Sequence, residues 1–418
     1  MKKEITILAI ETSCDETAAA VISGGISKSQ ETNSKFEIPK ILSSVVSSQI
    51  DLHAKTGGVV PEVASRAHME AIIPVIEEAI KGANSKFETQ NPKQIQNNND
   101  QNSKHVSSLG FSASDLLSEI THIAVTAGPG LIGSLLVGFN TAKALAYSLD
   151  LPLIPINHIE GHIYSAMPAR VESQKSVKSK VQGIKFPILA LTVSGGHTSL
   201  TLVEDHLKYR TLGQTIDDAA GEAFDKVAKL LGLGYPGGPE VSKFARKYRN
   251  KVESRKSIKS KVQGIEFPRP LINHPNFDFS FSGLKTAVLT HVLKLKAKSS
   301  KLSAFQKEEV CFVFEEAAID VLATKTMRAA REFRPKGIIL AGGVAANGRL
   351  REELKARIER YNSEVEEKYK MNFYLPSPGM SGDNAAMIGL AAYYHIIEGE
   401  KGDWRKSEIS ANLQITDL

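Results

Sequence analysis

The chain has 418 residues, of which 42% are hydrophobic and 23% charged, and its formal net charge is +6. A single hydrophobic core stops growing near ~250 to 300 residues, so this length predicts two domains. The only cysteines, Cys14 and Cys311, exclude a disulfide framework and favour a reducing compartment. The amino-terminal apolar run is short and soon meets Glu11, which argues against a signal peptide, and no run reaches the ~18 residues of a membrane span. We therefore expect a soluble cytoplasmic protein.

The positive charge is concentrated in two copies of one segment. The stretch "VESQKSVKSKVQGIKFP" at 171–187 recurs almost unchanged as "VESRKSIKSKVQGIEFP" at 252–268, and the copies hold most of the excess charge. Copied Ser- and Lys-rich segments are typical of solvated surface inserts rather than of nucleic-acid sites. The polar stretches at 84–110 and 23–40 lack the apolar residues needed for packing, so we expect loops there, with disorder at 84–110.

Two successions of secondary-structure elements each occur twice along the chain. A strand, a small polar turn and a second strand are predicted at 5–22 and again at 186–204. A strand, a glycine-rich turn and a helix are predicted at 121–149 and again at 335–358. The repeated order predicts an α/β fold of two domains with a cleft between them.

A further helix is predicted at 61–80, within "PEVASRAHMEAIIPVIEEAI". Its apolar residues recur at intervals of four, with two isoleucines beside them: Val63, Ala67, Ala71, Val75 and Ala79, then Ile72 and Ile76. So wide an apolar stripe is typical of a face that packs on the core.

Three glycine-rich turns stand at matching places in the two halves: "AGPG" at 127–130, "SGGHT" at 194–198 and "AGGVAAN" at 341–347. Glycine turns let backbone amides close on phosphate oxygens, and a following helix adds its positive end. One such turn serves tight packing equally well, but three together predict a nucleotide in the cleft. The chain lacks the G-x-x-x-x-G-K-[ST] motif, so it is not a P-loop protein by this test.

The sequence "NHIEGH" at 157–162 places His158 and His162 four positions apart. On a helix this spacing brings both imidazoles to one face, where they could bind one metal ion. The spacing alone leaves packed or surface histidines as an open alternative.

The chain closely resembles the bacterial TsaD family, formerly labelled O-sialoglycoprotein endopeptidase, in eight ordered motifs: "ETSCDET", "HAKTGGVVPEVASRAH", "NHIEGH", "VSGGHT", "GEAFDKVAKLLGLGYPGGP", "FSFSGLKTA", "GGVAAN" and "SGDNAA". The resemblance implies the two-domain α/β fold of actin, hexokinase and the heat-shock ATPases (ASKHA), with a nucleotide cleft. It also implies transfer of threonylcarbamoyl from threonylcarbamoyl-AMP to N6 of the adenosine 3′ of the anticodon, in tRNAs that read codons beginning with A.

We expect a first domain at 1–170, with a disordered insert at about 84–112, and a second domain at 186–375. The copied inserts at 171–187 and 252–268 would interrupt the chain, and the segment 376–418 would return to the first domain.

The resemblance also implies site residues. His158, His162 and Asp383 match the family's metal ligands, and such a set suits one iron(II) per chain, or zinc. The implied substrate contacts are Thr192, Val193, Ser194, Gly195, Gly196, Asp225, Gly238 and Asn347. Asp15 and Glu16 could position the amine or take its proton, although turn formation would also explain them. Asn347 could equally cap the helix that follows.

The implied partners are the anticodon loop of tRNA, threonylcarbamoyl-AMP, and the proteins TsaB and TsaE, with no membrane. For the helix at 61–80, the resemblance adds an alternative to core packing: it forms a bundle with TsaB, together with the helix after "AGPG".

Three other functions compete. A zinc peptidase would need a glutamate directly after the first histidine, but Ile159 stands there and Glu160 comes one residue later. A small-molecule kinase of the same superfamily would use the glycine turns but has no need of the histidine pair. A non-enzymatic TsaB-like subunit should lack the metal set that this chain keeps.

Overall fold

A computed structural model describes residues 4–25, 38–90, 114–171, 184–254, 265–299 and 301–417, without the side chains of 85–90, 114–116 and 171. The loops predicted at 23–40 and 84–110 and both copied inserts lie largely outside these residues. The chain divides into unit 1, formed by Met1–Gln49, Val60–Ile184 and Asp383–Leu418, and unit 2, formed by Ile50–Val59 and Lys185–Gly382.

Unit 1 is built on a six-stranded sheet in the order β5-β4-β1-β2-β3-β6. Its strands are β1 (Glu4–Glu11), β2 (Glu16–Gly25), β3 (Lys40–Ser48), β4 (His122–Gly128), β5 (Leu153–Asn157) and β6 (Arg170–Val171). Strands β1, β2 and β3 are antiparallel neighbours, whereas β4 runs parallel to β1 and β5 runs parallel to β4. Nearly every residue of β1 and β2 is buried, as expected for strands covered on both faces.

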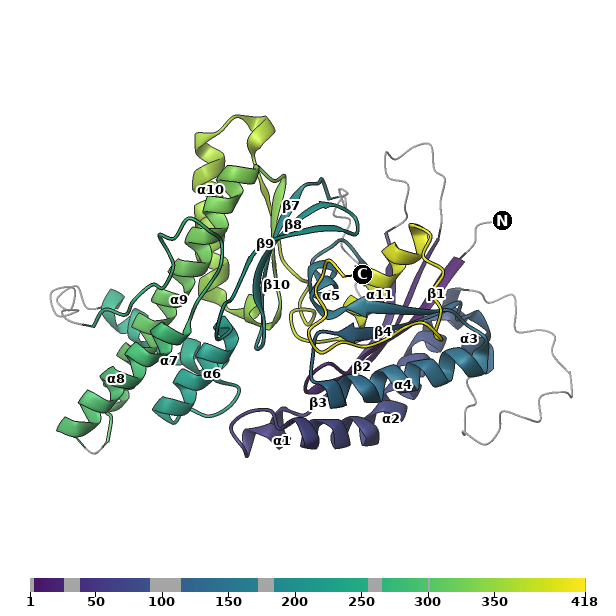
Figure 1. Cartoon of the computed structure of the whole chain (residues 1–418), viewed down its shortest axis with the longest axis horizontal. Helices are drawn as coiled ribbons and strands as arrows, with labels where there is room; N and C mark the ends of the chain where they lie inside the picture. The colour runs from purple at the N-terminus through teal and green to yellow at the C-terminus, as the bar shows by residue number, and fades with distance from the viewer. Residues whose placement is uncertain are drawn as a thin grey trace, which may run out of the picture. The chain divides into compact units, whose positions relative to one another are not determined.

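Helices cover this sheet on both sides (Figure 1). They are α2 (Pro61–Gln90), α3 (Ser114–Glu119), α4 (Ile132–Leu149), α5 (His158–Ser165) and α11 (Ala385–Ile397). Helices α2 and α4 pack together in one core with Leu8 and Ile10 of β1. Helix α11 lies on the other face, where a Cβ added to Gly389 would come within 3.1 Å of the Cβ of Ala9.

Unit 2 repeats the plan with a five-stranded sheet in the order β11-β10-β7-β8-β9. The strands are β7 (Ile188–Val193), β8 (Thr198–Asp205), β9 (Lys208–Gln214), β10 (Gly337–Ala341) and β11 (Asn372–Tyr374). Again the first three are antiparallel, and the last two run parallel to the first and to each other. The order matches β5-β4-β1-β2-β3 of unit 1, so the predicted ASKHA-type α/β fold of two units is confirmed.

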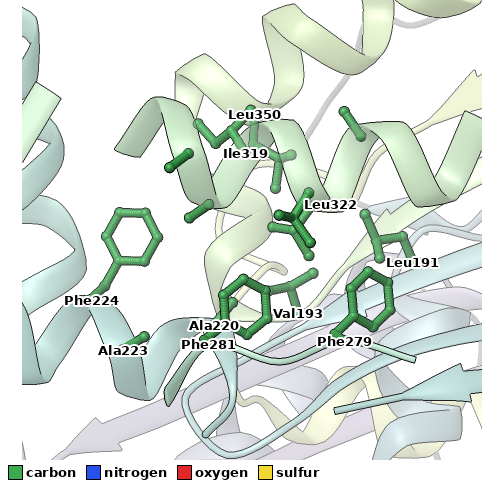
Figure 2. Close-up of a cluster of buried hydrophobic side chains, with 14 of the residues drawn as sticks. Leu191, Val193, Ala220, Ala223, Phe224, Phe279, Phe281, Ile319, Leu322 and Leu350 are labelled. Atoms are coloured by element: carbon green, nitrogen blue, oxygen red, sulfur yellow. The ribbon is translucent and has the colours of Figure 1, made fainter. Parts of the chain in front are cut away.

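The helices of unit 2 are α1 (Ile50–Ala54), α6 (Ala220–Leu231), α7 (Gly237–Ser254), α8 (Ser282–Lys298), α9 (Ala304–Phe333) and α10 (Gly348–Glu364), with short 3-10 turns η2 (Gly343–Ala346) and η3 (Glu367–Tyr369). Figure 2 shows part of their core, a buried cluster that includes Val193 of β7, Phe224 of α6 and Leu322 of α9. This core fixes the start of α6 and the end of β7, which leads into the glycine turn at 194–198.

The strand-turn-strand and strand-turn-helix orders predicted from the sequence are all present. Two expectations are corrected. Helix α2 continues to Gln90, into the stretch predicted as a loop from residue 84, and residues 50–59, between β3 and α2, belong to unit 2 rather than to the first half of the chain. Among the described helices, none is long and apolar enough to cross a membrane.

Candidate functional site

The histidine pair lies on α5, which begins directly after β5. The side chain of Asn157 caps this helix by accepting hydrogen bonds from the amides of Ile159 and Glu160, at 2.8 and 3.3 Å. Its amide group donates to the carbonyl of Leu413 at 3.1 Å, which ties the cap to another part of unit 1. The cap fixes where the helix starts, so His158 and His162 share one face as the spacing predicts.

Asp383 lies opposite this pair, just before α11. Its Oδ1 is 3.5 Å from Nε2 of His158 and 3.2 Å from Nε2 of His162. The three side chains can each offer one ligand atom, and these atoms all lie within 4.8 Å of one another. The sequence-predicted metal residues are therefore brought together, although they come from positions more than 200 apart in the chain.

The donor set fits a divalent metal ion. Both histidines are buried, and among the described residues Nδ1 of His162 makes no hydrogen bond, while its Nε2 meets Asp383 Oδ1 at 3.2 Å without hydrogen-bond geometry. A buried polar atom without a partner is costly, and a metal ion is one partner that an imidazole nitrogen accepts. Two imidazoles and one carboxylate also leave coordination positions free for a substrate.

The electrostatics around His158 favour positive charge. Burial opposes the charged form of the ring, but the carboxylates of Asp383 and Glu11 outweigh it and raise the pKa of His158 to about 9. The same two carboxylates would attract a metal cation, which would bind in exchange for the proton.

Glu11, the last residue of β1, is a neighbour of the site that the sequence did not single out. Its Oε2 lies 3.0 Å from Nδ1 of His158, on the ring edge opposite Nε2. Ser13 Oγ is 3.1 Å from the same nitrogen. Both residues stand in the quoted motif "ETSCDET", but nothing in their spacing relates them to a histidine far along the chain.

Asp15 and Glu16 lie where the turn after β1 enters β2, in the same unit as the metal candidates. Their side chains share a hydrogen bond. Burial, and then the charges of Asp383 and Asp15, raise the pKa of Glu16 to about 10. The raised pKa favours the protonated form of Glu16, which can then donate a hydrogen bond.

Hydrogen bonds fix this turn at three successive residues, Thr12, Ser13 and Cys14. Thr12 donates its hydroxyl proton to the carbonyl of Ser134 at 2.9 Å, and the amide of Leu131 donates to the carbonyl of Ser13 at 2.8 Å. His68 of α2 lies with Nε2 3.0 Å from the carbonyl of Cys14. Since a carbonyl can only accept, Nε2 carries the proton, and α2 and α4 together fix the turn.

The nucleotide candidates lie in unit 2, and five of them, residues 192–196, form the end of β7 and the turn to β8. The amide of Ser194 donates to the carbonyl of His197 at 2.8 Å, and the amide of His197 donates to Ser194 Oγ at 3.1 Å. At Gly195 and Gly196 an added Cβ would meet nothing within 4 Å. The closed turn thus presents an open backbone surface of the kind that receives a phosphate.

Two further glycines, from the turn after β10 and from the start of α6, pack against the end of β7 and this turn. A Cβ on Gly342 would lie 2.4 Å from the carbonyl oxygen of Val193, and one on Gly221 would lie 2.4 Å from that of Ser194. The turn after β10 and the start of α6 therefore touch the end of β7. Thr192 Oγ1 is buried there without a hydrogen-bond partner among the described residues.

Asp225, on α6, is tied to the next helix. Its Oδ1 accepts a hydrogen bond of 2.7 Å from the amide of Gly237. The neighbouring Gly238 is open, since an added Cβ would contact nothing within 4 Å. One carboxylate oxygen of Asp225 is thus engaged in joining α6 to α7.

Asn347 caps α10, which is the alternative role considered for it. Its Oδ1 accepts a hydrogen bond of 2.9 Å from the amide of Leu350, and its Nδ2 donates to Ser242 Oγ and Glu315 Oε1 at 2.9 and 3.1 Å. The side-chain amide is therefore committed to protein partners at both ends.

The turn "AGPG" after β4 differs from the other two. A Cβ on Gly128 would overlap the carbonyl oxygen of Ser410, and one on Gly130 would lie 2.6 Å from that of Ser13. The protein's own backbone occupies the space beside these glycines, so this third turn serves close packing and the expectation of a third phosphate cradle is corrected.

Comparison with known proteins agrees with these observations. The sequence matches the TsaD family, described as tRNA N6-adenosine threonylcarbamoyltransferase, over residues 40–91 and 106–390. Proteins of that name are similar to the chain in Syntrophotalea carbinolica, with 40% identity over 95% of this chain and 93% of the relative, and in Clostridium perfringens strain SM101, with 42% identity over 96% and 95%.

A solved structure of HypF from T. kodakarensis is similar at a TM-score of 0.49 and 14% identity, covering 96% of this chain and 50% of that one. At that level the likeness carries no argument about function. The match to the family model and the near-complete coverage of the relatives carry the assignment, and the chain belongs to the TsaD family.

Proposed function

We propose that the chain transfers threonylcarbamoyl from threonylcarbamoyl-AMP to N6 of the adenosine 3′ of the anticodon, in tRNAs that read codons beginning with A, and releases AMP. Membership of the TsaD family and the shared name of the relatives support a threonylcarbamoyltransferase acting on tRNA adenosine. The observation that carries the proposal is the convergence of His158, His162 and Asp383, whose ligand atoms lie within 4.8 Å of one another.

The chemistry explains the need for an activated donor. Adenine N6 is a weak nucleophile because its lone pair is delocalised into the ring, so the carbamoyl carbon must carry a good leaving group. In threonylcarbamoyl-AMP that group is AMP. The open backbone of Gly195 and Gly196 would receive its phosphate and stabilise the charge that develops as AMP leaves.

We propose the remaining nucleotide contacts in unit 2 as well. Asp225 would accept hydrogen bonds from ribose hydroxyls. Gly238, Val193 and Thr192 would line the same region through their backbone. For Asn347 the proposal is restricted to the backbone, because its side-chain amide already caps α10 and contacts Glu315.

We assign His158, His162 and Asp383 as ligands of one iron(II) ion, with zinc as the alternative. When bound, the ion would supply Lewis acidity and a fixed point that orients the threonyl part of the donor. Asp15 would accept the proton that N6 releases, while Glu16, whose pKa is raised to about 10, would donate a hydrogen bond to Asp15.

A peptidase is disfavoured by the position of Glu160. Both of its carboxylate oxygens lie 3.0 to 3.1 Å from Nε2 of His395, and its side chain is buried. A metallopeptidase needs a glutamate beside the metal-bound water, and this one is engaged elsewhere.

For partners, we propose TsaB and TsaE in addition to tRNA. The outer faces of α2 and α4 support a bound TsaB, because they expose the apolar side chains of Met69, Ile73, Ile132 and Leu136. Monomeric proteins rarely leave a contiguous apolar face uncovered.

The test is a transfer assay with purified chain, TsaB, TsaE, threonylcarbamoyl-AMP and unmodified tRNA, followed by nucleoside analysis. We expect modified adenosine with the wild type and a loss of at least ~100-fold with His158→Ala combined with His162→Ala. The exposed Leu293→Ala serves as a control variant. Equal product from the double variant and the wild type would refute the role of the histidine pair.

A further inference from the structure

The carboxylate of Glu11 is buried in a way that calls for an explanation. Glu11 ends β1, its side chain is fully buried, and its only ion pair among the described residues is with His158. A buried carboxylate that meets no lysine or arginine carries a large desolvation cost, which must be offset by hydrogen bonds to its charged form.

Donors from three separate parts of unit 1 provide that compensation. The amide of Ser13 donates to Oε1 at 2.5 Å, and the hydroxyl of Thr126 donates to Oε2 at 2.6 Å. Nδ1 of His158 lies 3.0 Å from the same Oε2. The carboxylate is therefore held in one orientation by β4 and by the turn after β1, and it presents an acceptor to His158.

This contact determines which nitrogen of His158 carries the proton. A carboxylate accepts, so a neutral His158 holds its proton on Nδ1, and the lone pair is left on Nε2. Nε2 is the nitrogen that faces Asp383, at 3.5 Å from Oδ1. A carboxylate behind a metal-binding histidine fixes both the tautomer and the ring plane in this manner.

The second histidine has no such support. Neither nitrogen of His162 makes a hydrogen bond among the described residues, and its ring packs edge-on against that of His158, with centroids 4.6 Å apart. The orientation of His162 thus depends partly on the orientation of His158. The contact of Glu11 with His158 therefore helps to orient both rings.

We propose that Glu11 is a positioning residue for the metal centre, which holds His158 in the Nδ1-protonated tautomer with Nε2 directed toward Asp383. The inference rests on the metal assignment in the proposed function. It adds a residue that touches neither the metal nor the substrate and acts through His158.

Metal binding tests the role without recourse to catalysis. The full-length chain is stripped of metal and titrated with Co²⁺, and the affinity and the visible d–d spectrum are recorded. We expect Glu11→Gln to weaken Co²⁺ binding ~10- to 100-fold, as removal of an outer carboxylate does in other metal sites, and to alter the spectrum.

A second variant separates positioning from simple loss of charge. Glu11→Asp keeps the negative charge but is one carbon shorter, so its carboxylate cannot keep the 3.0 Å contact with Nδ1. We expect Glu11→Asp to weaken binding by at least ~10-fold too. Wild-type affinity in Glu11→Asp would reduce the role of Glu11 to its charge and overturn the proposal.

Glu160→Gln is the matched control, because it also removes a buried carboxylate that contacts a histidine, on the far side of α5. We expect its Co²⁺ affinity to stay within ~3-fold of the wild type, and an equal loss in both variants would count against Glu11.

Should the Glu11 variants fail to fold by circular dichroism, Thr126→Val takes their place: a loss of ~3-fold or more supports the proposal and an unchanged affinity overturns it. A wild type that binds no Co²⁺ would refute the metal centre itself.

Discussion

At the scale of single residues, Asp15 and Glu16 show how neighbours of the same type are given different roles. They are adjacent in the chain and share a hydrogen bond, but burial and the charges of Asp383 and Asp15 raise the pKa of Glu16 to about 10. A metal ion bound by Asp383 would offset one of these causes and leave the others. The environment, rather than the residue type, therefore supports the proposal that Asp15 acts as the base.

This difference predicts unequal effects of two isosteric changes. Asp15→Asn should lower kcat by ~10²- to 10⁴-fold, because the proton acceptor is lost. Glu16→Gln keeps a hydrogen-bond donor and should lower kcat less than ~10-fold. Single-turnover kinetics with excess enzyme would measure both, and a greater loss in Glu16→Gln would reverse the assignment.

The residues that the sequence did not reveal are also informative at this scale. Glu11 and His68 act on partners that lie far away in the chain, and no spacing rule relates a glutamate at the end of one strand to a histidine on a later helix. In contrast, His158 and His162 were visible because both belong to one helix turn. Asp383 came only from the resemblance to a family.

At the scale of elements, α5 is held from two sides. Nδ1 of His158 contacts Glu11 on one side, and on the other Glu160 contacts Nε2 of His395, on α11, at 3.0 Å. Nδ1 of His395 in turn lies 2.6 Å from Glu400. This buried contact therefore joins α5 to α11 on the side of α5 that faces away from the histidine pair.

The contacts of His395 with Glu160 and Glu400 also predict that the stability of the protein depends on pH. Burial disfavours the charged ring of His395, but hydrogen bonds with Glu160 and Glu400 outweigh it and raise the pKa to about 10, against an ordinary value of 6.5. A raised pKa in the folded state means that the stabilisation is fully present below pH ~6.5 and is lost as the pH rises toward ~10.

We therefore expect His395→Gln to lower the free energy of unfolding by ~3 kcal/mol at pH 6, and by much less at pH 10. The exposed His274→Gln is the control. Urea unfolding at the two pH values would measure the difference, and a pH-independent deficit in His395→Gln would contradict the charged pair.

The helices α2 and α4 carry a second prediction at this scale. Their inner faces hold the turn that bears Asp15, whereas the outer faces expose Met69 and Leu136, which are 67% and 45% exposed. Met69→Lys with Leu136→Lys should weaken TsaB binding by at least ~100-fold without lowering the melting temperature, since such hydrophobic positions dominate interfaces. Leu293→Lys on α8, where the side chain is 56% exposed, should bind normally. Calorimetry with purified TsaB would distinguish the three proteins.

At the scale of the whole molecule, the duplicated sheet was predictable and the division of the chain was less so. Alternation and glycine turns are local signals, and they gave both copies of the strand-turn-strand and strand-turn-helix orders. The placement of 50–59 in unit 2 and the extension of α2 to Gln90 depend on tertiary contacts, which no local pattern records. The same holds for "AGPG", whose glycines resemble the others until Ser410 is seen beside Gly128.

The two units should respond to different ligands. Hydrogen exchange measured by mass spectrometry should show that Co²⁺ protects peptides covering α5 and the start of α11, whereas AMP protects peptides covering 192–198 and 341–348, because each ligand stabilises the segment it contacts. Protection of the same peptides by either ligand alone would contradict this division. The double variant at His158 and His162 should abolish the first response and keep the second.

The origin of unit 1 from three chain segments has a consequence for its synthesis. Unit 2 is almost contiguous, but Asp383 and α11 belong to the last segment of unit 1. During translation, His158 and His162 emerge from the ribosome long before Asp383. Strand β1 likewise emerges long before α11, the helix that covers one of its faces. A nascent chain can thus bring the three side chains together only after both sheets have been made, and any fragment that stops short of Asp383 would retain two histidines with no carboxylate opposite them.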